Sequence, residues 1–341
     1  MSRLEYAALF GSVCCSSLWH VVGKMALENS HPNQIIFIFY RLSLASMVLL
    51  LVAGYSGGRK PETWKFLIPG SPLLLFLGCC KAVNALSFFR ALSLSSPAVC
   101  ALMQPTVPVF VLLIAWMRGE GGVIGGRRLA GVTLAVAGAV GGAWVGGRSS
   151  ESASENSLIL ALFFLILQAS AIATLLTYQA KLLSAYPTAP ALVVTGLIYA
   201  CAGFVTFPLA VLQPWKDWGL GGNEGAWAAL GYCVIFATAF SYGAITWATK
   251  RGVSPGTVSV FITLEPFITA SLSQIFLGSG VGGGLFFVCG FLVAIGVALT
   301  LSDPDRKEEN GFEMINKDVK GVKIGFRSQI QSENEEDTHY L

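Results

Sequence analysis

The sequence is dominated by apolar runs of about 20 residues that are almost free of charge and are separated by short polar or glycine-rich breaks. A helix of about 20 residues crosses the hydrocarbon core of a bilayer, and a helix satisfies its own backbone hydrogen bonds there. Ten such runs are found, at roughly 6–27, 35–55, 66–92, 97–117, 127–147, 157–182, 188–213, 226–249, 254–277 and 281–302. The pattern predicts an all-α polytopic membrane protein with ten transmembrane helices.

The composition excludes an ordinary soluble domain. Hydrophobic residues make up 54% of the chain and charged residues only 12%, whereas soluble domains carry about a quarter charged residues. The segment 303–341 alone holds ten acids and six Lys or Arg. It is too polar to bury a core, so we predict a disordered cytosolic tail over 303–341.

The distribution of Lys and Arg predicts the orientation, since cytosolic loops are enriched in these residues. An N-terminus inside the cell gives 16 cytosolic cations, at 3, 59, 60, 65, 118, 127, 128, 181, 250 and 251 and the six of the tail. The opposite side receives four, at 24, 90, 148 and 216. Both termini are therefore predicted to be cytosolic, in a plasma membrane or endomembrane that the sequence does not identify.

The two halves of the chain repeat. Ser96-Pro97 is followed by Pro108, and Ser254-Pro255 by Pro266, with the same spacing of 11 residues between prolines and a constant offset of 158. Ten spans divide into five and five. Because each half has an odd number of spans, the second half enters the membrane with the opposite orientation to the first. We predict a first repeat over 1–147, a linker over 148–156 and a second, inverted repeat over 157–302.

Several segments resemble EamA-type carriers of the drug/metabolite transporter superfamily. They are "SLSSPAVCALMQPTVPVFVLLIAWMRGE", "RGVSPGTVSVFITLEPFITASLSQIFLGSG", "LFGSVCCSSLWHVVGKMAL", "FFRALSLSSPA" and "QAKLLSAYPTAPALVVTGLIYACAG", the last similar to plant nodulin-like members. The resemblance implies a carrier with a central site between its halves and alternating access by rocking. The chain departs from the family at Ser279, where Glu is frequent, and at Glu265, an acid that members do not generally share.

Prolines in the middle of a span free a backbone carbonyl, which is tolerated where other helices or a cavity satisfy it. Pro105, Pro108 and Pro266 are therefore expected at a helix break that borders the central cavity. A simple kink is the alternative for each proline, and the matched pair Pro108 and Pro266 favours the functional interpretation.

Ionisable residues at bilayer depth are costly and normally face the protein interior. Four candidates lie deep in the predicted spans: His20, Arg41, Lys81 and Glu265. Glu265 could accept a coupling proton, bind a cationic group of a substrate, or neutralise Arg41 or Lys81.

Helical spacing groups the other candidates. Lys81, Asn84 and Phe88 share one face of the third span, as do Thr238, Tyr242 and Thr246 on the eighth. Lys81 with amide and aromatic neighbours would suit an organic anion or a zwitterion. The full predicted binding set is Trp19, His20, Arg41, Lys81, Asn84, Phe88, Gln104, Gln168, Tyr242, Thr246, Thr263 and Glu265. Membrane-interface or packing roles for the aromatics, and interhelical hydrogen bonds for Asn84 and Gln168, are the alternatives.

The fifth span carries Gly138, Gly142 and Gly146 at four-residue intervals, a pattern typical of close helix packing, with a homodimer as an alternative. The eight cysteines lie inside apolar runs, without the spacing of a metal or disulfide site. We therefore expect no metal at these residues. We also expect no cofactor and no nucleic-acid partner.

The leading hypothesis is a secondary transporter that moves a small organic metabolite, together with a coupling proton or in exchange for a counter-substrate. A non-transporting receptor or assembly protein with the same fold is the alternative. An enzyme is disfavoured because the chain has three His and no nucleophile or metal motif. Amino acids, indoles, purine metabolites and sugar derivatives all stay open as substrates.

Overall fold

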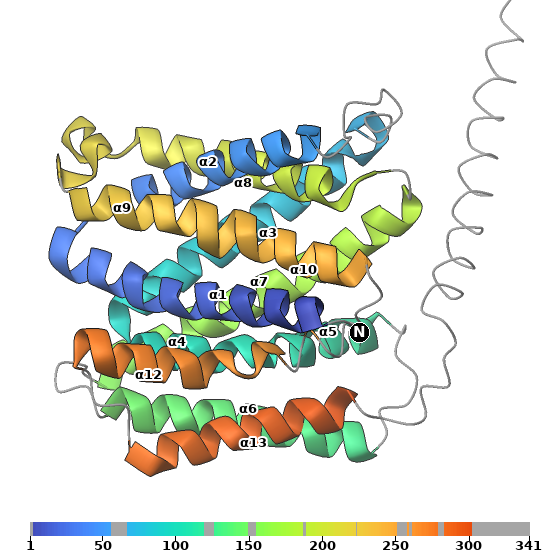
Figure 1. Ribbon diagram of the computed structural model, residues 1–341, viewed down its shortest axis with the longest axis vertical. Helices are drawn as coiled ribbons and strands as arrows, with labels where there is room; N and C mark the ends of the chain where they lie inside the picture. Colours follow the sequence, from blue (N-terminus) through green and yellow to red (C-terminus); the bar gives the residue numbers. More distant parts are fainter. Residues whose placement is uncertain are drawn as a thin grey trace, which may run out of the picture.

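The computed structural model describes residues 3–55, 67–118, 126–148, 155–186, 189–222, 224–250, 258, 261–278 and 283–301. All regular elements within these ranges are helices, which lie side by side in a bundle (Figure 1). The tail 303–341, most of the linker 148–156, and the predicted landmarks Ser254, Pro255 and Ser279 lie outside the described residues.

The first half contains α1 (Arg3–Ser30), α2 (Gln34–Tyr55), α3 (Leu67–Leu94), α4 (Pro97–Met103), the short 3-10 helix η2 (Gln104–Thr106), α5 (Val107–Met117) and α6 (Gly126–Arg148). Ser96 begins α4 as an N-cap: its side chain accepts a hydrogen bond from the Val99 amide, and Pro97 occupies the first turn, where no amide donor is needed.

The second half contains α7 (Glu155–Ala185), α8 (Ala191–Val211), η3 (Trp215–Gly222), α9 (Glu224–Tyr232), the π-helical segment η4 (Cys233–Phe240), α10 (Ser241–Lys250), α12 (Glu265–Leu277) and α13 (Gly283–Leu301). α12 ends at Leu277 and is capped by Gly278, whose φ of 60° is readily adopted by glycine.

Nine stretches of helix among the described residues are long and apolar enough to cross a membrane. They correspond to nine of the ten predicted spans. The remaining predicted span, 254–277, is described only in part, and its described helix α12 has 13 residues. The all-α polytopic fold is confirmed, and the count of ten stays a prediction.

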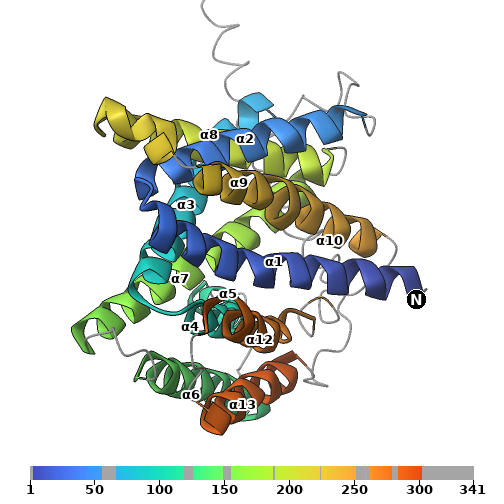
Figure 2. The ribbon, with the colours of Figure 1, turned by 60° about the vertical axis from the view of Figure 1, so that its left-hand side comes forward.

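Counterpart helices of the two halves pack against each other in antiparallel pairs at opposite ends of the bundle, α2 with α8 and α6 with α13 (Figures 1 and 2). Along α2, Phe39 lies against Phe207 of α8, and the Ser46 hydroxyl donates to the Gly196 carbonyl. Because residue numbers rise along one helix as they fall along the other, equivalent helices run in opposite directions. The second half is therefore inverted relative to the first.

The α6–α13 contact carries the same offset as the sequence repeat. Gly131 approaches the backbone of Gly296, and Gly138 approaches the backbone of Cys289. Shifting each member of one pair by 158 residues into the other half gives the other pair, as a two-fold relation between the halves requires. The offset that relates Pro108 to Pro266 thus also relates two close helix contacts.

The glycines spaced four residues apart on α6 pack against other helices of the same chain. A Cβ at Gly138, Gly142 or Gly146 would lie within 3.2 Å of atoms in other helices, including residues of α13 in each case. The close-packing interpretation is confirmed, and a homodimer would need a different surface.

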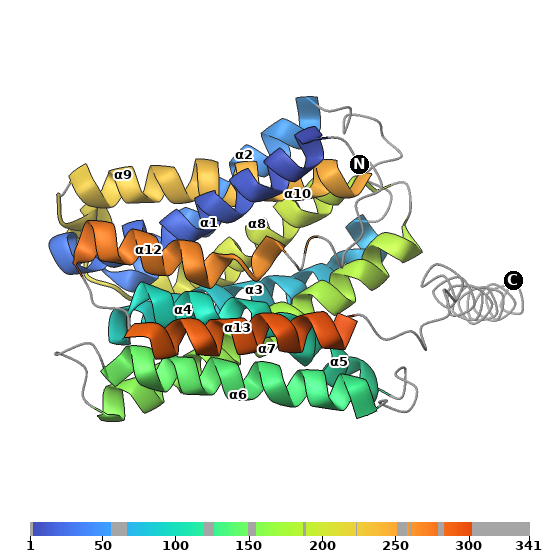
Figure 3. The same cartoon turned by 60° about the horizontal axis from the view of Figure 1, so that its bottom comes forward.

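The remaining contacts follow the same symmetry. α1 packs against α9 and α10 as α7 packs against α3, and α1 packs against α12 as α7 packs against α5. In Figure 3, α12 lies between α1 and α4, with α13 below them and α6 along the lower edge. The first helix of each half therefore contacts the proline-containing helix of the other half.

Candidate functional site

The helices of the proline-containing segments are interrupted where the sequence predicted a break. α4 gives way to η2 at Gln104, and α5 begins at Val107 with Pro108 in its first turn. α12 begins at Glu265 with Pro266 in its first turn, after a turn at 263–264. Pro105 and Pro266 are buried, and Pro108 is partly buried.

Lys81 of α3 is enclosed by aromatic rings. Its Nζ lies 4.7 Å from the centroid of the Tyr199 ring of α8 and 6.0 Å from that of Tyr242 of α10. It donates a hydrogen bond of 3.3 Å to Asn84 Oδ1, and the residue is 5% exposed. Within the described part of the chain, no carboxylate lies within ion-pair distance of Lys81. Lys81 also interacts with the Tyr242 hydroxyl, so its partners in the described structure are two rings, an amide oxygen and a phenol.

A chain of amides extends from Lys81 towards the helix break. Asn84 Nδ2 donates to the main-chain carbonyl of Gln168 in α7, at 3.5 Å. Gln168 Nε2 donates to Gln104 Oε1 in η2, also at 3.5 Å. Gln168 Oε1 is buried and accepts no hydrogen bond from the protein. An acceptor of this kind is available to a donor group on a ligand.

Arg41 of α2 lies over the ring of Trp19, with its guanidinium carbon 4.8 Å from the ring centroid. Trp19 also stacks with Phe37 and Phe89, each at a centroid distance of 6.2 Å. Its indole Nε1 is buried without a hydrogen-bond acceptor. Arg41 and Lys81 both act electrostatically on Cys233, so the two cations belong to one charged region.

His20 of α1 and Glu265 of α12 form the second polar contact of the site. The distance between His20 Nδ1 and Glu265 Oε1 is 3.5 Å, and both residues are buried, at 3% and 6% exposed. His20 Nδ1 is also 2.9 Å from the Ser16 carbonyl, and its ring meets Phe88 edge-on. Of the ionisable partners that the sequence left open for Glu265, neither Arg41 nor Lys81 is within ion-pair distance in the described structure; its partner is His20.

The predicted binding set therefore divides into connected groups. Lys81, Asn84, Gln168 and Gln104 form one chain, with Tyr242 beside Lys81; Arg41 and Trp19 form a second group, and His20, Phe88 and Glu265 a third. Thr263 is partly buried in the turn before Glu265. The side chain of Thr246 lies outside the described residues.

Tyr199 is the main residue that sequence reasoning missed. It is buried in α8, beneath Lys81, and its ring meets the Tyr242 ring edge-on at 6.1 Å. A single tyrosine inside the apolar run "VVTGLIYACAG" was an available signal, because a phenol hydroxyl at bilayer depth needs a polar surrounding.

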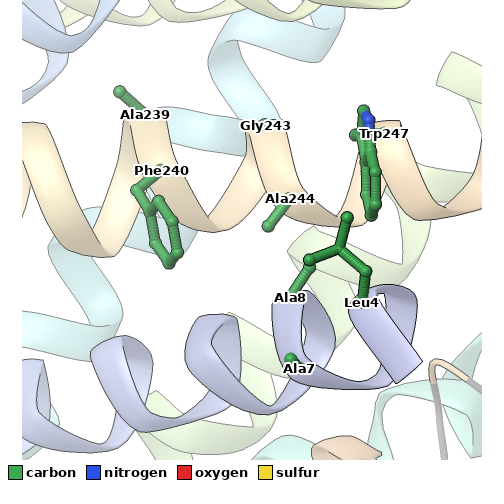
Figure 4. Close-up of a pocket in the computed structure, with 8 residues that line it drawn as sticks. All are labelled: Leu4, Ala7, Ala8, Ala239, Phe240, Gly243, Ala244 and Trp247. Atoms are coloured by element: carbon green, nitrogen blue, oxygen red, sulfur yellow. The ribbon is translucent and has the colours of Figure 1, made fainter. Parts of the chain in front are cut away.

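A separate groove of about 440 Å³ lies between α1 and the consecutive elements η4 and α10 (Figure 4). Its lining is almost entirely apolar: Leu4, Ala7, Ala8, Ala239, Phe240, Gly243, Ala244 and Trp247. The groove does not correspond to the polar chamber predicted from the sequence. In this structure the buried polar side chains of Lys81, Asn84, Gln168, His20 and Glu265 contact other protein groups in the interior.

These features define a polytopic membrane protein with two inverted halves and buried polar residues where the halves meet. The chain belongs to the EamA-like transporter family, whose sequence model matches residues 3–142 and 159–302. Members of this family are membrane transporters of the drug/metabolite superfamily.

A solved crystal structure has a similar fold. It matches over 88% of this chain and 97% of its own, with a TM-score of 0.57 and 16% sequence identity. At this identity the likeness concerns the fold alone.

Proposed function

We propose that this protein is a secondary transporter that moves a small organic anion, or a zwitterion bound through its negative group, by alternating access. The observation that carries this proposal is Lys81, a buried cation that faces two tyrosine rings and has no carboxylate partner among the described residues. An anion is the chemical group that this arrangement lacks.

A comparison of the cost of burying Lys81 with the energy that its contacts return supports a functional role for this residue. A charged side chain at the bilayer centre costs about 2.5–3.5 kcal/mol on insertion scales. A cation–π contact returns about 0.5–2 kcal/mol, the higher value applying to desolvated sites. Two rings, the Asn84 amide oxygen and the Tyr242 hydroxyl stabilise Lys81 without a carboxylate, and Arg41 adds a second cation to the region. A bound anion would be attracted by both.

The neighbouring side chains suit a polar organic molecule. Trp19 Nε1 offers a free donor, and Gln168 Oε1 offers a free acceptor. The tyrosine rings beside Lys81 offer apolar faces to a flat body. We assign the anionic group to Lys81 and Arg41, and the remaining polar groups of the substrate to these amide and indole atoms.

Transport requires the two halves to move relative to each other. Lys81 belongs to the first half, whereas Tyr199 and Tyr242 belong to the second. Because these side chains are packed together in the interior, a metabolite gains access only when the halves separate on one side. Inverted repeats supply two equivalent ways of doing so, one facing each side of the membrane.

The test compares anions with neutral analogues of the same shape. Thermal-shift screening of the purified protein against amino acids, indole carboxylates, purine metabolites and sugar derivatives identifies ligands, because a ligand that binds only the folded form raises the apparent stability. Benzenesulfonate and benzenesulfonamide form a matched charged and neutral pair. Stabilisation by benzenesulfonate but not by the amide supports the proposal, and equal stabilisation contradicts it.

Transport itself is tested in proteoliposomes loaded with unlabelled ligand. Labelled ligand from the screen enters by counterflow if the protein is a carrier, whereas a receptor binds the label without counterflow. We expect Lys81→Ala to reduce counterflow at least tenfold. Lys216→Ala, which removes an exposed cation of η3, serves as the matched control and should leave it unchanged.

A further inference from the structure

We propose that His20 and Glu265 together bind a proton, and that this proton is bound cooperatively with the substrate anion, which makes the protein a proton–anion symporter. The inference rests on the proposed transport of an anion and adds the coupling ion and its site. It is carried by a direct contact between two buried ionisable side chains from opposite halves.

The contact between His20 and Glu265 lies at the interface between the two halves, so it would change when the halves move relative to each other. Glu265 is the first residue of α12, directly after the helix break and before Pro266. The Ser17 hydroxyl donates to the Glu265 main-chain carbonyl at 3.4 Å, and the Thr269 hydroxyl donates to the Ser17 carbonyl at 3.5 Å. These bonds tie α1 to the start of α12. Rocking of one half against the other would therefore change the surroundings of the His20–Glu265 pair.

One proton makes the pair electrically neutral. With a proton bound, the pair is either a neutral acid beside a neutral imidazole or a carboxylate beside an imidazolium, and its net charge is zero in both forms. Without that proton, the net charge is −1 in a buried apolar setting, where an unpaired carboxylate is unfavourable. His20 Nε2 is buried and makes no hydrogen bond with the protein, so the second ring nitrogen is not committed elsewhere.

The charged group that reaches this pair from a neighbouring helix is Arg41 of α2, which acts electrostatically on His20. On α1 itself, Lys24 and Glu28 lie one and two turns further along and pair with each other at 3.5 Å. The other described titratable groups on α1 and on the helices packed against α1 or α12 are Glu5, Tyr6, Cys14, Cys15, Cys79, Cys80, Lys81, Arg90, Cys100, Glu224, Tyr232, Cys233, Tyr242 and Cys289. In this set the acids Glu5, Glu28 and Glu224 lie near the ends of membrane-spanning helices, whereas Glu265 lies midway along the predicted span 254–277.

Arg41 gives the physical link between proton and anion. Its positive charge opposes a further positive charge on the pair, since like charges in a region of low dielectric repel. An anion bound between Lys81 and Arg41 would offset that repulsion and favour the protonated pair. By thermodynamic linkage, protonation of the pair then favours anion binding by the same factor. The predicted direction is therefore symport, with proton and anion bound together.

The first experiment uses the proton alone as its probe. Proteoliposomes adsorbed on a solid-supported membrane are exposed to a step from pH 8 to pH 6 without any organic ligand. Wild type should give a transient charge displacement as the pair is protonated. Glu265→Gln should reduce it to the background of empty liposomes, whereas Glu28→Gln, an exposed acid of α1, should leave it unchanged. Absence of displacement in wild type, or full displacement in Glu265→Gln, would overturn the proposal.

The second experiment measures the linkage by titrating benzenesulfonate at pH 8 and at pH 6. Benzenesulfonate is the probe because its own charge does not change in this range. Wild type should bind it about fivefold or more tightly at pH 6, the lower end of usual coupling factors. Glu265→Gln should bind it equally at both values, and Glu265→Asp, which keeps the carboxyl group, should retain part of the effect.

Different results would contradict the anion-transport proposal and the proton-coupling proposal. If benzenesulfonate and the anions of the ligand screen fail to bind wild type at either pH, the anion-transport proposal is wrong. If wild type binds benzenesulfonate equally at pH 8 and pH 6, the anion site stands and the proton coupling is wrong. If Glu265→Gln does not fold, the wild-type titration and pH step still decide the matter.

Discussion

Lys81 Nζ lies 4.7 Å from the ring centroid of Tyr199, so a cation of the first half rests on an aromatic face of the second half. This contact joins two helices, α3 and α8, that also pack along their length. It gives the interior a positive charge whose position depends on how the halves are arranged. A mobile interface between the halves would therefore move the charge that we assign to substrate binding.

The ring of Tyr199 is predicted to matter more than its hydroxyl. Tyr199→Phe keeps an aromatic face under Lys81 and should leave counterflow of the screened anion within about threefold of wild type. Tyr199→Leu removes a cation–π contact in a desolvated site, about 1–2 kcal/mol, and should weaken anion binding roughly 5–30-fold. Equal binding by the two variants would show that the ring does not position Lys81.

The close approach of α6 and α13 is predicted to be sensitive to a single methyl group. A Cβ at Gly296 would lie 2.4 Å from the Ala135 amide nitrogen, a backbone atom that cannot rotate away. Gly296→Ala should therefore destabilise the protein by about 1–3 kcal/mol. Thermal unfolding in detergent measures this, with Gly231→Ala as the control because a Cβ there meets no atom within 4 Å. An unchanged unfolding temperature for Gly296→Ala would contradict the packing.

The matched proline Pro266 is predicted to affect transport more than folding. Replacing it with alanine allows a more continuous helix and removes the steric cause of the break before α12. We expect Pro266→Ala to slow counterflow several-fold with an unfolding temperature at least as high as that of wild type. Pro72→Ala, at an exposed proline inside α3, should leave counterflow unchanged, and its unfolding temperature should rise because alanine restores a helical hydrogen bond. Wild-type counterflow in Pro266→Ala would remove the break from the mechanism.

The predicted orientation requires the cations assigned to the cytosolic side to lie at one end of the bundle. Arg118 and Lys181, both assigned to the cytosolic side, lie over the same ring of Tyr178, at 4.8 and 5.9 Å. Lys24, assigned to the opposite side, donates to the Leu92 carbonyl at the other end of α3. Proteolysis of sealed right-side-out vesicles should spare an epitope fused to Leu341 and cleave one inserted beside Lys216. The reverse pattern would invert the assignment.

The fold was readable from the sequence because its signals are local or periodic. Apolar runs whose length matches the bilayer thickness predicted the helices. The spacing from Pro108 to Pro266 predicted the repeat, and the odd number of predicted spans in each half predicted its inversion. The glycine interval of Gly138 and Gly142 predicted close packing, although the partner helix α13 became known only from the structure.

The burial of the ionisable candidates was predictable from the sequence, and their pairing was not. Because burying an ionisable residue in a membrane is costly, residues such as Glu265 can be chosen as candidates without knowing their partners. Whether Glu265 meets Arg41, Lys81 or His20 depends on the rotation and depth of α1 and α12, which helical spacing within one span does not determine. Tyr199 was missed for the same reason, because its role arises from α3 across the interface between the halves.

The most direct test of the central claim is the position of a bound anion in an experimental map. Crystals grown with 4-iodobenzenesulfonate would locate the iodine by its anomalous signal and the sulfonate by its density. We predict the sulfonate beside Lys81, with the ring next to Tyr199 and Tyr242. An anion bound in the apolar groove between α1 and α10, with nothing beside Lys81, would contradict the account.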